Sequence, residues 1–239
     1  MKQPLPLQGV RVHLSGSIHG DATPRESKGI ALFVERLARA VLREGGTLIH
    51  GSHPTFDQPL QAAAQPFVSN GGARDALTLV RAHKFAITSQ QLAEVEVQRQ
   101  YCTVQVIPSM WGNPDQSLLP MREWMAEHCD LVVAIGGEHW KDDKKQAGVP
   151  EELEEALFRG KPGFVVGGFG GATAGYIQEH DAVFSRLRNG LPVSENRAMA
   201  LSTEVDDLVN GIISQIQRLP LIQENIHGPP DTTTSRSSI

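Results

Sequence analysis

Glycines, hydroxyls and carboxylates gather in three short segments, and each segment follows a run of apolar residues. The candidate ligand-binding residues in them are Ser15, Gly16, Ser17, Gly51, Ser52, His53, Thr55, Gly136, Gly137, Glu138 and Gly148. Glycine lets the backbone come close to a ligand, while hydroxyls and backbone amides donate hydrogen bonds to phosphate without needing net positive charge. The segments therefore predict a site for a compact anionic ligand.

Each of these features also has a structural interpretation. The segment around Gly16 lacks the third glycine and the following acid of a dinucleotide fingerprint, so an ordinary strand-to-helix turn is its alternative. His53 is a candidate ligand contact, although a lone histidine is more often structural. Glu151 and Glu152 directly follow Pro150, and both proline and acids are favoured in the first turn of a helix. Helix capping is therefore the alternative to a catalytic role for either glutamate.

The elements that must position these residues alternate along the chain. Strands are predicted over 9–15, 47–50, 76–82, 103–107, 131–135, 163–166 and around 199–201, and helices over 26–44, 117–127, 149–159 and 204–218. This alternation predicts an α/β fold: a doubly wound, mostly parallel, Rossmann-like sheet of about seven strands with helices on both faces. Ligands bind such sheets outside the carboxyl ends of the strands, so the three segments should converge on one pocket.

Length and composition favour one domain over 9–220, with an N-terminal extension over 1–8 and a disordered tail over 221–239. A net charge of −5, with no basic run and only 5% aromatic residues, argues against nucleic acid as a partner. The chain has neither a signal-peptide pattern nor 18 consecutive apolar residues, so we expect no membrane contact and a cytoplasmic location. Cys102 and Cys129 lack metal-site spacing and are expected to be reduced, inert thiols. No metal site and no cofactor are predicted.

Three stretches together resemble the motifs of the Lonely Guy (LOG) phosphoribohydrolases. They are Met121-Arg122, the strand and glycines over 130–137, and the run Gly148-Val149-Pro150-Glu151-Glu152-Leu153; the family shows M-x-x-R-K, a strand and P-G-G-x-G-T-x-x-E. With the loops over 14–17 and 50–55, the chain is similar over 9–217 to the wider SMF/DprA–LOG (SLOG) superfamily. The resemblance implies a Rossmann-like fold that holds a nucleotide or a nucleotide derivative. It also implies catalytic roles near the ribose for Arg122 and Glu152.

The sequence departs from the LOG motif at three places. Ile135 replaces its proline, Val149 replaces its threonine, and the stretch 138–147 interrupts its glycine loop. In that insertion, Trp140 is a candidate to stack on a base, and its lysines are candidates to meet phosphate; a solvated charged loop is the alternative. Those lysines are Lys141, Lys144 and Lys145.

The resemblance leaves three functions open. The first is an enzyme that hydrolyses the N-glycosidic bond of a nucleotide or nucleotide derivative. The second is a non-catalytic sensor of a nucleotide-derived second messenger, such as an ADP-ribose-like or cyclic nucleotide, in a prokaryotic defence or signalling system. Such a sensor would act on a separately encoded effector. The third is a structural subunit with a relic pocket. Relatives of this kind imply a homo-oligomer.

Overall fold

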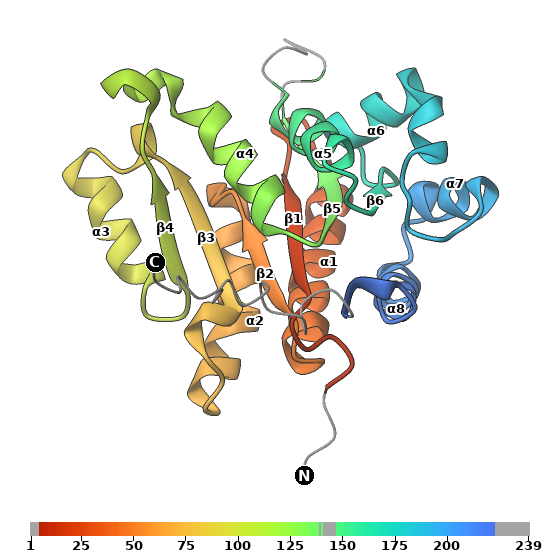
Figure 1. Ribbon diagram of the computed structural model, residues 1–239, viewed down its shortest axis with the longest axis horizontal. Coiled ribbons are helices and arrows are strands. Elements are labelled where there is room, and N and C mark those ends of the chain that lie inside the picture. The colour runs from red at the N-terminus through yellow and green to blue at the C-terminus, as the bar shows by residue number, and fades with distance from the viewer. Residues whose placement is uncertain (1–4, 139, 141–146, 223–239) are drawn as a thin grey trace, which may run out of the picture.

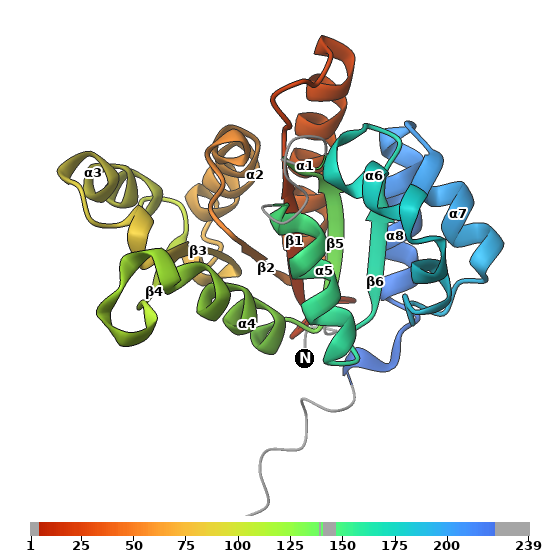
Figure 2. The ribbon, with the colours of Figure 1, turned by 90° about the horizontal axis from the view of Figure 1, so that it is seen from above.

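The computed structural model describes residues 5–138, 140 and 147–222, and these form a parallel sheet with helices on both faces (Figures 1 and 2). The strands are β1 (Arg11–Ser17), β2 (Thr47–His50), β3 (Leu77–Ala82), β4 (Thr103–Ile107), β5 (Leu131–Gly136) and β6 (Gly163–Val166). The helices are α1 (Pro24–Arg43), α2 (Asp57–Ser69), α3 (Ser89–Gln98), α4 (Leu118–His128), α5 (Gly148–Phe158), α6 (Gly171–Glu179), α7 (Val193–Leu201) and α8 (Val205–Ile216).

The strand order is β4-β3-β2-β1-β5-β6, and every pairing is parallel. The chain therefore runs outward from β1 to β4 and then returns to place β5 on the other side of β1. In a doubly wound sheet this reversal opens a crevice at the carboxyl ends of the two central strands. Ser17 at the end of β1 is paired with Gly136 at the end of β5, so both loops start at the same level.

The side chains of the central strands alternate between two cores. In β5, Leu131, Val133 and Ile135 belong to the core shared with α1, α2 and α8, whereas Val132 and Ala134 belong to the core under α5. The same alternation sends Val12 and Leu14 of β1 toward α1. It leaves the side chains of His13 and Ser15 on the opposite face, beneath α5.

The helix that follows β1 begins at a site that the sequence encodes locally. The Thr23 hydroxyl accepts the backbone N–H of Glu26, and the Glu26 carboxylate accepts the backbone N–H of Thr23, which is a complete capping box. Ile30, Phe33 and Leu37 then recur on one helical face and are fully buried against the sheet. Helix α1 is thereby placed firmly behind β1 and β2.

The predicted fold class is confirmed, but the prediction of about seven strands is wrong, because the described residues contain six. Residues 199–201, predicted as the last strand, form the end of α7. Three residues are too few to show a period, and methionine, alanine and leucine are good helix formers. The Ala200 carbonyl accepts the N–H of Gly167 just beyond β6, at 2.8 Å, so the helix end covers this edge.

Two further predictions concern the ends of the chain. The expected extension over 1–8 is described from residue 5, and there the fully buried Leu7 donates its N–H to Glu44 at 2.8 Å. The expected disordered tail lies outside the described residues from 223 onward, as do the three lysines of the insertion. Within the described ranges, no helix combines the length and hydrophobicity that a bilayer crossing requires.

Candidate functional site

A cavity of about 240 Å³, the central cavity, lies where the carboxyl ends of β1, β2 and β5 meet α4 and α5. This is the point at which the strand order reverses, where doubly wound sheets bind ligands. The sequence-predicted residues that line it are Gly16, Ser17, Gly51, His53, Arg122, Glu138, Gly148 and Glu152. The three predicted loops therefore meet at one cavity, together with the two helices that carry Arg122 and Glu152.

Glu152 forms the floor of the central cavity, and its two carboxylate oxygens differ in surroundings. The Ser15 hydroxyl donates to Oε2 at 2.6 Å, and Nε2 of the buried His13 lies 3.4 Å from the same oxygen. Oε1 faces the loops instead: a Cβ atom added to Gly51 would lie 3.7 Å from it, and one added to Gly148 would lie 3.9 Å away. One oxygen is thus anchored, while the other faces the space that a ligand would occupy.

The charges beneath the cavity stabilise one another. Burial alone would raise the pKa of Glu152, but the nearby charge of His13, the Ser15 hydroxyl and the charge of Arg122 bring this pKa below its usual value. Burial opposes protonation of His13, yet its interactions with Cys129 and Glu152 raise its pKa to about 9. At neutral pH the site therefore holds a carboxylate beside an imidazolium.

Arg122 approaches the cavity from α4. Its guanidinium forms an ion pair with Glu151 in the first turn of α5, and its Nη2 would lie 3.1 Å from a Cβ atom at Gly148. Its Nε atom is buried and makes no hydrogen bond within the part of the chain that the structure describes. Arg122 and Glu152 line the same cavity, and Arg122 pairs directly with the neighbouring Glu151.

The loop after β2 is shaped by His50, whose ring stacks on Phe56 with centroids 5.0 Å apart. Its Nδ1 lies 2.8 Å from the Leu14 carbonyl, and its Nε2 accepts the backbone N–H of His53 at 3.2 Å. These contacts require a proton on Nδ1 and a lone pair on Nε2, which is the neutral form. Burial accordingly lowers the pKa of His50 to about 4.

Two predicted residues of this loop lie beside the central cavity rather than on its wall. The Thr55 hydroxyl accepts the Ile18 N–H at 3.0 Å and lies 2.9 Å from Nδ1 of His53, so it ties the β1 loop to the β2 loop. Ser52 adopts a left-handed backbone with φ 52°, and its hydroxyl accepts a hydrogen bond from Arg81 at 3.1 Å. Ser52 lines a second, adjoining cavity instead.

Packing already requires glycine at several of these positions, among them Gly16, which also lines the central cavity. This residue lies inside β1, and an added Cβ atom would be 2.5 Å from the Ile135 carbonyl oxygen. Gly136 and Gly137 have φ values of 62° and 96°, and an added Cβ at Gly136 would lie 2.3 Å from the Ser17 carbonyl. The close pairing of β1 with β5 excludes a side chain at Gly16 and Gly136, whereas packing against Val149 and Ala172 excludes one at Gly137.

Trp140, a candidate for base stacking, lies apart from the central cavity. Its ring meets Tyr176 edge-on at 6.0 Å and covers Gly175 of α6. It borders a different cavity of about 770 Å³, which also receives Gly137 and Glu138. Trp140 therefore contributes to packing around α6 and to that separate cavity.

Sequence reasoning missed three residues that organise the site: His13, His50 and Arg81. Each is an ionisable side chain inside a strand whose neighbours are apolar, and each is at most 5% exposed. Burying such groups is costly unless they find partners, so their presence in buried strands was itself a signal.

Comparison with known proteins places the chain in a family. Residues 70–198 match the family model described as SLOG cluster2. The chain belongs to this SLOG family. The matched segment reaches from before β3 into α7 and contains Arg122 and Glu152, whereas the loops after β1 and β2 precede it. No curated protein matches the chain.

Three solved structures illustrate the similarity of the chain to known proteins. The structural genomics target TM1055 is 18% identical with a TM-score of 0.47, covering 71% of the SLOG chain and 81% of its own. A molybdenum cofactor binding protein from Rippkaea orientalis is 17% identical with a TM-score of 0.45, covering 75% and 86%. DNA processing protein A from Streptococcus pneumoniae is 15% identical with a TM-score of 0.46, covering 74% and 56%.

Proposed function

We propose that this SLOG protein binds a nucleotide or nucleotide derivative in the central cavity and hydrolyses its N-glycosidic bond. The observation that carries this proposal is the placement of Glu152, a carboxylate with one oxygen anchored by Ser15 and the other facing a cavity that also receives Arg122. An anchored, charged carboxylate can stabilise a sugar that gains positive charge during the reaction. A guanidinium next to it can bind the phosphate of the same substrate.

Cleavage of an N-glycosidic bond makes the ribose oxocarbenium-like as the bond to the base breaks. The Glu152 carboxylate stabilises that positive charge and accepts a proton from the water that adds to the anomeric carbon. The departing base keeps the bonding electrons and takes up a proton from solvent, and Glu152 afterwards releases to solvent the proton that it accepted from water. Arg122 binds the phosphate or the sugar hydroxyls through its planar fork of donors, in exchange for its contact with Glu151.

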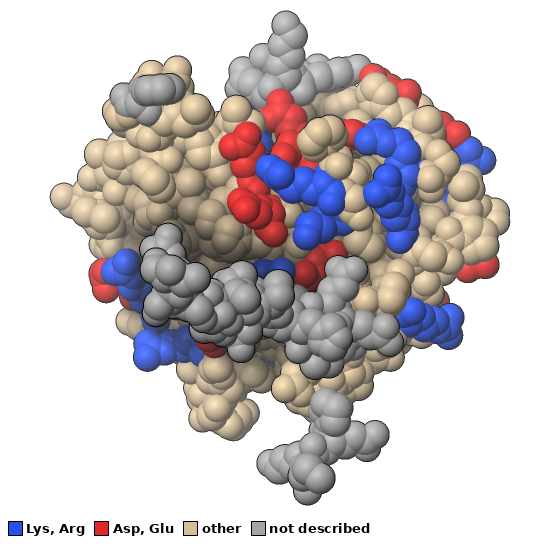
Figure 3. Space-filling model, viewed as in Figure 1, with Lys and Arg blue, Asp and Glu red and all other residues tan. Residues whose placement is uncertain are grey.

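A small ligand, rather than nucleic acid, is also supported by the surface. On the face seen in Figure 3, Lys and Arg side chains lie beside Asp and Glu side chains around α4 and α5, and they form no continuous basic surface there. Proteins that bind nucleic acid through its phosphates present such a surface.

One observation favours a second function, a non-catalytic sensor of a nucleotide-derived second messenger. Val149 lines the central cavity at the position where the LOG motif has threonine, so a hydroxyl that would bind phosphate is replaced by an apolar side chain. A sensor retains affinity without turnover. A separately encoded effector belongs to this second proposal. Self-association is proposed for either function, and light scattering of the purified protein tests it.

The experiment incubates the purified protein with AMP, NAD, ADP-ribose and cyclic nucleotides, measures free base by chromatography, and records thermal shifts. We expect free base from at least one compound. Glu152→Gln should retain affinity but lose turnover by a factor of about 10² to 10⁴, because the amide can neither stabilise positive charge nor act as a base.

Glu155→Gln is the matched control, since Glu155 lies on the same helix but pairs with Arg159 at 2.9 Å and does not line the central cavity. A thermal shift without free base would favour the sensor. If none of the compounds gives a thermal shift or free base, both proposals are overturned.

A further inference from the structure

A second cavity of about 430 Å³, the side cavity, adjoins the central cavity. Gly51, His53 and Phe85 line both, so the two spaces share one wall. The side cavity lies between the β2 loop, the carboxyl end of β3 and the first turns of α3. A ligand in the central cavity therefore reaches the side cavity by extending past these three residues.

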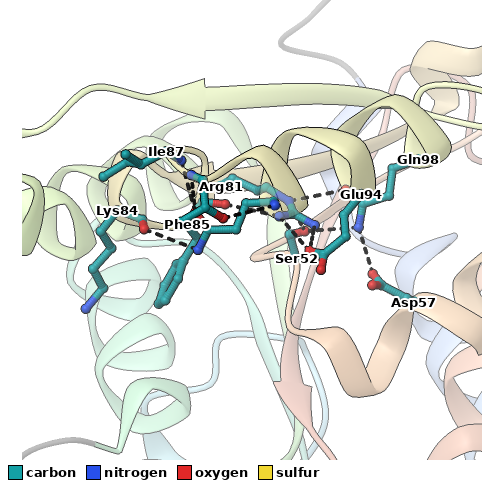
Figure 4. Close-up of polar contacts among 10 residues, drawn as sticks. Ser52, Asp57, Arg81, Lys84, Phe85, Ile87, Glu94 and Gln98 are labelled. Carbon is teal, nitrogen blue, oxygen red and sulfur yellow. Dashed lines mark hydrogen bonds and ion pairs between the residues drawn. The ribbon is translucent and has the colours of Figure 1, made fainter.

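Arg81, near the end of β3, is the cationic side chain of the side cavity, and it is only 5% exposed (Figure 4). Its Nε donates to the Ser52 hydroxyl at 3.1 Å and to the side-chain amide oxygen of Gln98, Oε1, at 3.2 Å. Its Nη1 donates to the Phe85 carbonyl at 3.1 Å. These neutral partners hold the guanidinium in place without neutralising its charge.

The carboxylate that balances the charge of Arg81 makes only a weak ion pair with it. Within the described ranges, Glu94 supplies the carboxylate in ion-pair contact with Arg81, and both Nη atoms are 3.4 Å from a single oxygen, Oε2. Glu94 is 46% exposed, whereas a well-formed carboxylate–arginine pair uses two oxygens at shorter range. Asp57 also interacts electrostatically with Arg81, but it makes no ion-pair contact with it, and its carboxylate accepts a hydrogen bond from Gln98 at 2.9 Å. An anion inside the cavity can therefore displace Glu94 at small cost.

The rest of the side cavity combines polar and apolar groups. Thr88, Gln90 and Gln91 line it from the start of α3, where the Thr88 hydroxyl and the Gln91 side chain form the capping box of this helix. Arg81 also holds Ser52 in its left-handed conformation, and strain of this kind concentrates at ligand sites.

We propose that the side cavity is an anion subsite in which Arg81 receives a second phosphate, with Glu94 as the exchangeable counter-ion of the empty state. The ligand class is then a pyrophosphate-linked nucleotide rather than a nucleoside monophosphate. Binding of the nucleoside and its first phosphate in the central cavity rests on the function proposed above. The Arg81 subsite itself depends only on the side cavity.

Calorimetric titration with ADP-ribose and with AMP tests the inference. Glu94→Gln removes the competing charge and should raise the affinity for ADP-ribose about fivefold while leaving that for AMP unchanged. Glu96→Gln is the matched control, because Glu96 lies on the same helix but pairs with Arg99 outside the cavity, and it should change neither affinity. A purely structural Arg81 would not give a gain of affinity.

Arg81→Lys keeps the charge but loses the planar fork, and it should lower the ADP-ribose affinity about tenfold. Circular dichroism and melting curves of this variant show whether its fold is retained, and Glu94→Gln carries the test if it is not. Equal affinity of the native protein for AMP and ADP-ribose, with no effect of Glu94→Gln, overturns the subsite.

Inorganic pyrophosphate separates the two proposals. Binding that increases in Glu94→Gln and is unaffected by Arg122→Ala supports the subsite even if the central cavity neither binds nor cleaves a nucleotide. Release of base from AMP with no response to Glu94→Gln in any titration supports the central site and refutes the subsite.

Discussion

Replacing His13 with glutamine tests the buried ion pair beneath the central cavity. His13 has no exposed surface, its Nε2 lies 3.4 Å from the Glu152 carboxylate, and it also interacts with Cys129. Glutamine has a similar size and keeps a polar donor near Glu152, but it carries no charge. The substitution therefore removes the charge with little change in packing.

The magnitude follows from the pKa of His13, which rises from 6.5 to about 9 on folding. A difference of this size corresponds to about 3 kcal/mol of stabilisation. Because the folded protein binds the proton more tightly, this contribution is fully present below the unfolded pKa. It decreases as the pH rises from 6.5 and is lost above the folded value of about 9.

Urea unfolding at several pH values between about 6 and 10 measures this contribution. The free energy of unfolding of the native protein should fall by about 3 kcal/mol across this range, and that of His13→Gln should lack this decrease. The two proteins should differ most near pH 6 and converge at the alkaline end. His128→Gln, which replaces a half-buried histidine at the end of α4, is the control and should keep the native slope.

Parallel stability curves for the native protein and His13→Gln across this range would refute the reasoning. They would mean that His13 is neutral in the folded protein. Glu152 would then have no cation beneath it, and its charge would depend on Ser15 and Arg122 alone.

Three further outcomes follow from the same geometry. Gly16→Ala should destabilise the fold by about 1–3 kcal/mol in urea unfolding, because the new Cβ meets the Ile135 carbonyl at 2.5 Å; an unchanged midpoint would contradict this. Gly51→Ala should keep the native melting temperature but weaken nucleotide binding in calorimetry, since its Cβ would lie 3.7 Å from Oε1 of Glu152, and undiminished affinity would count against this cavity. His50 has a pKa lowered to about 4, so the native protein should lose about 3 kcal/mol as the pH falls from 6.5 to about 4, and His50→Gln should lack this loss in acid-range unfolding curves.

Much of the fold could be predicted because its signals are local. Runs of apolar, β-branched residues marked the central strands, and glycines marked their ends. The capping box at Thr23 and Glu26 marks the start of α1 within four residues of sequence. The failure at residues 199–201 has the same cause, since a three-residue apolar segment carries no period that separates a strand from a helix end.

The sequence was enough to predict where on the sheet the candidate site lies. It was not enough to predict which side chains contact one another there. Parallel strands bring their carboxyl ends to one edge, which is why loops after β1, β2 and β5 could be assigned to one cavity. Which side chains face it depends on the alternation within each strand and on the direction of each loop. Thr55 braces the loops, and Ser52 turns into the side cavity.

By itself, the sequence determined a doubly wound parallel fold and the loops that border its crevice, because these follow from short-range patterns. Arg122 and Glu152 became candidates through the resemblance to the LOG motifs. Only the tertiary structure decided that Ser15, 137 residues before Glu152, donates to its carboxylate, and that His13 supplies the charge beneath it. Such contacts join side chains of a strand to a residue near the start of a distant helix. They exist only once β1 and β5 are paired and α5 is packed over them.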